Sequence, residues 1–159
     1  MGITTGMLIF DDAEELDFVG PWEVFTMARY IKPDDRVVTI AQTREPIRAA
    51  KGMRIIPDHS FADAPELDVV LVPGGIGTRR EVGNPVLIDW LRQAGARCTW
   101  VTSVCTGALL LHEAGFAKGR PVTTHWGFVA ALRERGAEVL ENVRYVRDGN
   151  LVTAAGVSA

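Results

Sequence analysis

One cysteine stands where an apolar run gives way to small residues: Cys105, in Val101-Thr-Ser-Val-Cys-Thr-Gly-Ala108. This order is typical of a nucleophile elbow, in which the reactive side chain sits on a sharp turn between a strand and a helix. Free amides and the dipole at the start of such a helix stabilise a thiolate, lower the cysteine pKa and can bind an oxyanion. Most free cysteines are instead small, buried apolar residues. The elbow pattern favours a reactive Cys105, whereas Cys98, inside the expected strand, fits the structural role.

Glycines follow a second apolar run, in Pro73-Gly-Gly-Ile-Gly77. Gly74 and Gly75 can bring backbone amides next to the thiol, because they carry no side chain that would stand in the way. A phosphate-binding loop is disfavoured, since no Gly-Lys-Ser/Thr sequence follows the glycines. A plain structural turn is the competing interpretation.

A histidine forms a third candidate: His125, in Thr123-Thr-His-Trp126, follows a short strand candidate and could line the same crevice. A lone histidine is more often a hydrogen-bonded structural residue than a catalytic one. No second histidine or carboxylate lies at ligand spacing, so we expect no metal site.

Acidic residues crowd the segment after the first apolar run. They are Asp11, Asp12, Glu14, Glu15 and Asp17. At least some of them must be solvated loop charges, and spacing alone does not choose among them. A carboxyl group that touches Cys105 would stay protonated beside a thiolate, or share a proton with a neutral thiol.

Short apolar runs alternate with helical segments along the chain. The pattern predicts buried strands at 6–10, 36–42, 68–72 and 97–104, helices at 21–30, 85–94, 106–114 and 127–135, and hairpins at 47–57 and 143–154. This alternation indicates an α/β fold with a doubly wound, mostly parallel sheet and helices on both faces, in a single domain over residues 1–159. Ligands of such sheets bind beyond the carboxyl ends of the strands, so the acids, the glycines and Cys105 are expected to converge on one crevice.

Composition restricts the classes of function. Of the 159 residues, 47% are hydrophobic and 23% are charged, and the 17 basic residues are scattered among 20 acidic ones. These values are typical of a globular domain and argue against nucleic-acid binding by this segment. No run approaches the length of a membrane span, and no secretory signal precedes the first strand. A bridge between Cys98 and Cys105 would need the strand to fold back on itself, so we expect free thiols and a cytoplasmic location.

Taken together, these motifs resemble the ThiJ/PfpI superfamily of the class I glutamine amidotransferase-like (flavodoxin-like) fold. The resemblance covers nearly the whole chain and rests on Leu16-Asp17, Gly20-Pro21, Glu23-Val24, Leu71-Val-Pro-Gly-Gly75, Thr102-Ser-Val-Cys-Thr-Gly-Ala108, Thr123-Thr-His-Trp126, Val146-Arg-Asp-Gly-Asn150 and Ala155-Gly-Val-Ser-Ala159. Within the superfamily, the cysteine and histidine motifs look most like those of bacterial isocyanide (isonitrile) hydratases. They are also similar to the N-terminal sensor domains of AraC-type regulators.

The resemblance assigns roles to individual residues. It implies that Asp17 is the acid that contacts the nucleophile Cys105, that Thr106 completes the catalytic set, and that Gly75 offers its amide. Gly74, Gly75, Thr106 and His125 then form the expected oxyanion and substrate-binding set. Protease members of the superfamily carry histidine directly after the cysteine, where this chain has Thr106, so peptidase activity is not expected.

The implied function is hydration of an isocyanide, a small-molecule substrate, to an N-formamide through a covalent thioimidate on Cys105. No cofactor is required, and a homodimer is expected. The alternatives are the ligand-sensing domain of an AraC-type regulator and a protein of oxidative or carbonyl stress whose Cys105 oxidises. The segment 152–159 looks like a strand that turns into another helix, and this helix is absent, so we expect a truncated chain or a disordered C-terminus.

Overall fold

A seven-stranded sheet forms the centre of the molecule in the computed structural model, which describes residues 1–156. The strand order is β10-β11-β7-β6-β1-β2-β5. The strands are β1 (Thr4–Leu8), β2 (Arg36–Ala41), β5 (His59–Ser60), β6 (Val69–Val72), β7 (Trp100–Val104), β10 (Tyr145–Asp148) and β11 (Leu151–Ala154). All neighbouring pairs are parallel except β10 with β11. The predicted mostly parallel sheet is therefore confirmed.

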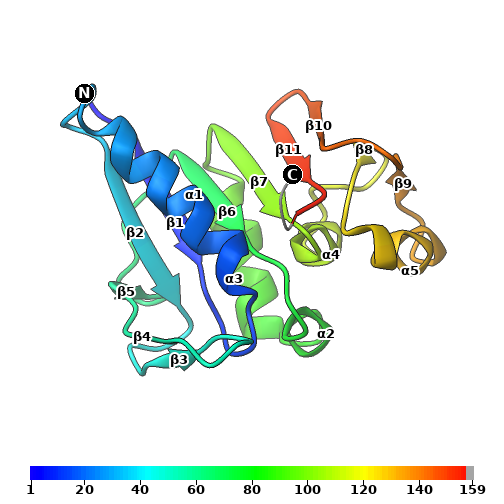
Figure 1. The fold of residues 1–159 in the computed structure, drawn as a ribbon, viewed down its shortest axis with the longest axis horizontal. Coiled ribbons are helices and arrows are strands. Elements are labelled where there is room, and N and C mark those ends of the chain that lie inside the picture. Colours follow the sequence, from blue (N-terminus) through cyan, green and yellow to red (C-terminus); the bar gives the residue numbers. More distant parts are fainter. Residues whose placement is uncertain (157–159) are drawn as a thin grey trace.

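The sheet is wound in two directions from its middle. From β1 the chain passes through α1 (Glu15–Ala28) to β2 on one side, whereas from β6 it passes through α3 (Pro85–Gly95) to β7 and through α4 (Gly107–Glu113) towards β11 on the other. Because such crossovers are right-handed, the reversal places α1 on one face and α3 and α4 on the opposite face. Figure 1 shows α1 in front of the strands and α3 behind them. The reversal lies between β1 and β6, where doubly wound folds bind ligands.

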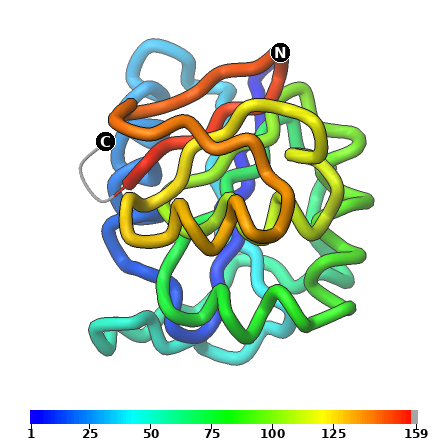
Figure 2. The backbone as a smooth tube through the Cα atoms, turned by 90° about the vertical axis from the view of Figure 1, so that its right-hand side faces the viewer, coloured from blue at the N-terminus to red at the C-terminus, as the bar shows by residue number. Residues whose placement is uncertain are grey.

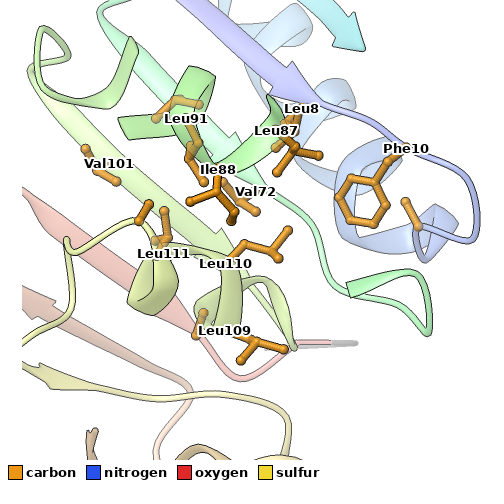
Figure 3. Close-up of a cluster of buried hydrophobic side chains, with 14 of the residues drawn as sticks. Leu8, Phe10, Val72, Leu87, Ile88, Leu91, Val101, Leu109, Leu110 and Leu111 are labelled. Atoms are coloured by element: carbon orange, nitrogen blue, oxygen red, sulfur yellow. The ribbon is translucent and has the colours of Figure 1, made fainter. Parts of the chain in front are cut away.

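The core fills the space between the central strands and the helices α3 and α4. Each of the four side chains of β6 is buried, as expected for a strand that is covered on both faces. Figure 3 shows aliphatic side chains from these strands meeting those of the two helices. The labelled residues are Leu8, Phe10, Val72, Leu87, Ile88, Leu91, Val101, Leu109, Leu110 and Leu111. This packing holds the carboxyl ends of β1, β6 and β7 at fixed positions relative to one another.

The first helix begins earlier than the sequence predicts. A helix at 21–30 was expected because proline favours the first turn, yet α1 starts at Glu15 and Pro21 lies inside it. Glu14 caps the helix with extended backbone, and its amide donates to the carbonyl of Gly74 at 2.9 Å. Acidic residues are favourable beside the unpaired amides of a first turn. The predicted acidic loop therefore becomes, in its last part, the first turn of a helix.

Several short elements complete the fold. The predicted hairpin at 47–57 is confirmed as β3 (Ile47–Arg48) paired with β4 (Arg54–Ile55). The short strand expected before His125 is β8 (Pro121–Val122), whereas its partner β9 (Glu138–Val139) and the helix α2 (Thr78–Glu81) were not predicted. The helix predicted at 127–135 is a 3-10 turn, η1 (Trp126–Phe128), followed by α5 (Val129–Glu134). Figure 2 shows this yellow-to-orange part of the chain on the side of the molecule that carries β10 and β11.

Two remaining expectations concern membranes and the end of the chain. Within the described part of the chain, no helix combines the length and the apolar character needed to cross a membrane. The predicted absence of a C-terminal helix concerns the end of the chain, of which residues 157–159 lie outside the described residues.

Candidate active site

Cys105 occupies a strained turn between a strand and a helix. β7 ends at Val104 and α4 begins at Gly107, and Cys105 between them has a φ of 56°, which is rare for a residue with a side chain. Its amide donates to the carbonyl of Ala154 at 2.9 Å, and its carbonyl accepts a hydrogen bond from Thr124 Oγ1 at 3.0 Å. These two hydrogen bonds thus hold Cys105 in a backbone conformation that a residue with a side chain disfavours on its own. This geometry confirms the predicted elbow.

Glycines allow three backbone segments to close around the thiol. A Cβ added to Gly74 would lie 2.7 Å from the Cβ of Cys105, and one added to Gly156 would lie equally close at 2.7 Å. At Gly107, an added Cβ would lie 2.2 Å from the carbonyl oxygen of Val72. These distances are far below van der Waals contact, so a side chain at any of the three positions would push the elbow apart.

Asp17 is the acid that the fold brings to Cys105. It lies in the first turn of α1 and is 1% exposed. Its Oδ2 accepts a hydrogen bond from the amide of Gly74 at 3.0 Å, whereas Oδ1 is buried and has no partner among the described residues. Burial raises the pKa of Asp17 to about 6, although the Gly74 amide and the Cys105 thiol both act to lower it. The free oxygen is therefore a buried proton acceptor at neutral pH.

The other four acids of the segment make different contacts. Asp11 accepts from the Arg48 amide at 2.8 Å, and Asp12 pairs with Arg80 at 3.2 Å. Glu14 and Glu15 both bind Lys51, through its ammonium group and its amide respectively. These four carboxylates bind groups on neighbouring loops. Asp17 is therefore the acid of this segment that acts on the Cys105 thiol.

The Cys105 thiol is protonated at neutral pH. Burial, together with the negative charge of Asp17, raises its pKa to about 11, against a lowering effect of the Thr106 amide and hydroxyl. The expected lowering of the Cys105 pKa at the start of the helix is therefore wrong. Desolvation outweighs the amides because the thiol is only 7% exposed. Of the two proton arrangements that the sequence left open, the structure favours a neutral thiol beside a carboxylate.

Thr106 and the glycine turn are linked by a buried hydrogen-bond network. The amide of Gly75 donates to Thr106 Oγ1 at 3.1 Å. Thr78 Oγ1 lies 2.8 Å from the Gly75 carbonyl and 3.1 Å from Thr106 Oγ1, and Thr78 is completely buried. The amides of Gly74 and Gly75, predicted to bind an oxyanion, thus have internal partners in the unliganded protein, where they orient Asp17 and Thr106.

Sequence reasoning missed two residues of this network. Thr78 and Arg79 both belong to the four-residue helix α2, which is too short to leave a periodic signal. Nη1 of Arg79 lies 3.1 Å from the Gly75 carbonyl, 3.2 Å from Thr78 Oγ1 and 3.5 Å from Thr106 Oγ1. Only the tertiary contact between α2 and the elbow identifies these residues.

The contacts of His125 are with residues that follow it in the chain. Its Nδ1 accepts a hydrogen bond from the Gly127 amide at 3.1 Å and caps the 3-10 turn, while its ring tilts against Trp126. Trp126 itself is 84% exposed. The neighbouring Thr124 holds the Cys105 carbonyl, so His125 follows the site directly along the chain. Its predicted role in substrate binding stays a prediction.

Cys98 has the environment of a structural residue. It is buried, and its Sγ donates to the carbonyl of Ala94 at 3.3 Å. Both cysteines are free thiols, as predicted. The side chains of residues 1–156 include no group of three potential ligands that could hold a metal ion.

Comparison with known proteins identifies the family. A model of the DJ-1/PfpI family matches residues 5–159. The chain belongs to the DJ-1/PfpI family. A crystal structure of a ThiJ/PfpI family protein from Pseudomonas syringae superimposes with a TM-score of 0.87 and 31% identity, covering 99% of this chain and 64% of that one. The flavodoxin-like fold expected for the family is therefore shown.

Two curated members of the family show how varied it is. This chain is 36% identical to an isonitrile hydratase from Pseudomonas putida over 159 residues, which is 100% of this chain and 68% of the hydratase. It is 28% identical to the HTH-type transcriptional regulator GbdR from Pseudomonas aeruginosa over 157 residues, which covers 42% of that protein. The chain thus spans about two thirds or less of the length of these relatives.

Proposed function

We propose that this DJ-1/PfpI chain hydrates isocyanides to N-formamides through a covalent intermediate on Cys105. The observation that carries the proposal is the pairing of a protonated, buried thiol with the free Oδ1 of Asp17, whose pKa is raised to about 6. The 36% identity to an isonitrile hydratase across the full chain supports the same reaction. A thiol and a carboxylate that exchange one proton are the groups that this addition needs.

In the first step the thiol adds to the isocyanide carbon. Oδ1 of Asp17 removes the proton of the Cys105 thiol as Sγ attacks the terminal carbon of R–N≡C and a C–S bond forms. The developing carbanion then takes the proton back from Asp17. The product is a thioimidate, R–N=CH–S–Cys105, and the carboxylate is regenerated. A pKa near 6 suits a group that must both accept and return a proton near neutral pH.

In the second step water releases the product. Asp17 accepts a proton from water as the water oxygen attacks the thioimidate carbon. Asp17 then gives this proton to the imine nitrogen. The C–S bond then breaks, the thiol recovers its proton, and the product R–NH–CHO leaves. No electrons are gained or lost overall, so the reaction balances with water alone.

Thr106 and the glycine amides orient the reacting groups. The Thr106 hydroxyl is bordered by the Gly75 amide and Thr78, and the Gly74 amide holds Oδ2 of Asp17 and leaves Oδ1 available for proton transfer. Thr106 also stands where protease members of the superfamily carry histidine, so the chain lacks the base that peptide hydrolysis would use at that position.

Turnover of a simple alkyl isocyanide tests the proposal. Purified protein incubated with cyclohexyl isocyanide is expected to form N-cyclohexylformamide, and intact mass spectrometry of a quenched reaction is expected to show an adduct on Cys105. Cys105→Ala should abolish both signals. Cys98→Ala is the matched control, because this buried thiol contacts the Ala94 carbonyl and lies outside the site. Absence of formamide at micromolar enzyme would contradict the assignment.

A ligand-sensing role is the second candidate. It is favoured by the match to GbdR, of which this chain covers 42%. A sensor would bind a small molecule at the same crevice without consuming it. Saturable binding of a ligand that protects Cys105 from alkylation, with no turnover of any isocyanide tested, would favour this function over hydration.

A further inference from the structure

Arg79 presents a positively charged group beside the elbow. Its Nη1 reaches the Gly75 carbonyl, Thr78 Oγ1 and Thr106 Oγ1, and Thr106 directly follows the nucleophile. Its guanidinium carbon lies 4.7 Å from the centre of the Phe128 ring, which supports the planar group by a cation–π contact. The side chain is thus held from two sides, although the residue as a whole is exposed.

The charge of Arg79 has no counter-ion within the described residues. The adjacent Arg80 pairs with Asp12 and Glu81, and other arginines of the chain pair with acids as well. For Arg79, residues 1–156 supply no Asp or Glu oxygen within ion-pair distance, and the contacts found involve Nη1 alone. Nε and Nη2 therefore remain free, and these two donors form the edge that binds a carboxylate with two parallel hydrogen bonds.

Arg79 also lines a groove on the surface. It has a volume of about 370 Å³ and runs between α2, α4 and α5. Leu109, Phe128 and Ala131 contribute apolar surface, and its charged residues are Arg79, Arg135 and Glu134. Figure 1 shows α2, α4 and α5 towards the same side of the molecule. Arg79 borders both this groove and Thr106, the residue next to Cys105, so a substrate that reacts at Cys105 can direct a charged group to Arg79.

We propose that Arg79 is a specificity-determining residue that binds a carboxylate of the substrate, so that the preferred isocyanides are those that carry a carboxylate near the reacting group. The inference rests on the proposed hydration and deepens it by naming the substrate class. The guanidinium edge, already oriented by Phe128 and Nη1, loses little freedom when it binds such a group. Asp17 does not compete for Arg79, because Oδ2 accepts from the Gly74 amide and Oδ1 has no hydrogen-bond partner among residues 1–156.

A purely structural role predicts a different kinetic pattern. Arg79 also contacts Thr106, so its removal can disturb the elbow. Such a disturbance would slow charged and uncharged substrates alike. Recognition of a carboxylate instead changes the ratio of the two rates, because only the charged substrate loses a partner.

The test compares isocyanoacetate with methyl isocyanoacetate, which has the same skeleton without the charge. The wild-type protein is expected to show the higher kcat/KM for isocyanoacetate. In Arg79→Met the ratio of charged to uncharged kcat/KM should fall by about 10- to 100-fold, the effect of losing a charge-assisted hydrogen-bonded pair. Arg79→Lys should fall between the two, because it keeps the charge without the two-donor edge. Arg29→Met removes the same charge at the far end of α1 and should leave the ratio unchanged.

Equal losses for both substrates in Arg79→Met would overturn the proposal, as would a wild-type protein with no preference. A binding measurement needs no variant and no turnover: calorimetric titration should show tighter binding of N-formylglycine than of its methyl ester, and equal affinities would also overturn it. If isocyanoacetate, methyl isocyanoacetate and cyclohexyl isocyanide are all inert, the hydration proposal fails. The binding comparison, repeated with Arg79→Met, then still decides whether Arg79 recognises a carboxylate, because only loss of the preference in this variant assigns it to Arg79.

Discussion

The amide of Gly74 donates a hydrogen bond to Oδ2 of Asp17 at 3.0 Å and so ties the glycine turn after β6 to the first turn of α1. The bond favours the ionised carboxylate, while burial opposes it and raises the pKa to about 6. The two effects leave Asp17 able to change its protonation state near neutral pH. They also leave its second oxygen free for the thiol.

Removing the charge of Asp17 should make the Cys105 thiol easier to ionise. The carboxylate helps to raise the thiol pKa to about 11, so Asp17→Asn is expected to shift that pKa downward. The measurement is the rate of iodoacetamide alkylation at Cys105 as a function of pH. Hydration of isocyanides should fall in the same variant, because the proton carrier is gone. Asp12→Asn is the control, since Asp12 pairs with Arg80 at the surface. Slower alkylation of Asp17→Asn across the whole pH range would contradict this electrostatic account.

The same substitution should stabilise the fold at neutral pH. The pKa of Asp17 rises from 3.8 to about 6 on folding, so its contribution to stability is fully present below pH 3.8 and is lost as pH rises through about 6. Above that pH the folded state carries a buried charge that costs up to about 3 kcal/mol. Asp17→Asn avoids this cost and keeps an acceptor for the Gly74 amide.

Denaturant unfolding of wild type and Asp17→Asn at pH 4 and pH 7.5 measures this effect. The stability advantage of the variant should be larger at pH 7.5 than at pH 4. A difference that does not depend on pH would indicate that packing, rather than the buried charge, separates the two proteins.

Alanine at Gly74 should damage the site through overlap. Its Cβ would lie 2.6 Å from the Thr106 nitrogen and 2.7 Å from the Cys105 Cβ, atoms that cannot rotate away. We expect a loss of about 1–3 kcal/mol in the free energy of unfolding and a larger fractional loss of activity. Gly83→Ala is the matched control, because its nearest contact would be the Arg80 carbonyl oxygen at 3.6 Å. Equal behaviour of the two variants, in unfolding experiments and assays, would show that the turn can adapt.

Thr78 is expected to position Thr106. Thr78→Val preserves the shape of this buried side chain but removes the hydroxyl beside Gly75 and Thr106, so we expect a loss of about 1–3 kcal/mol in stability. kcat should decrease more than KM changes, because the Thr106 hydroxyl loses its orientation. Thr78→Ser restores the hydroxyl and should recover most of kcat. If valine and serine variants have the same kcat, the hydroxyl has no part in orienting Thr106.

The main architecture and the nucleophile were predictable because both are local properties of the chain. Runs such as Val69–Val72 are apolar throughout and β-branched at most positions, which is the composition expected of a strand buried on both faces. The elbow at Cys105 was visible from the small residues that a sharp turn requires. The start of α1 was not predictable from Pro21, because the capping of that helix depends on a contact between Glu14 and Gly74, two residues far apart in sequence.

The sequence by itself determined the doubly wound sheet, the reactive cysteine and a group of acids near it. Spacing alone did not choose among those acids, and the choice of Asp17 came from family resemblance. Tertiary structure shows the physical basis of that choice: α1 buries Asp17 against Gly74, whereas Asp11, Asp12, Glu14 and Glu15 bind groups on other loops. It also reverses the expected shift of the thiol pKa, because desolvation depends on what surrounds a group. Only the tertiary structure identifies Thr78 and Arg79 as residues of the site, because a contact between α2 and the elbow leaves no pattern along the chain.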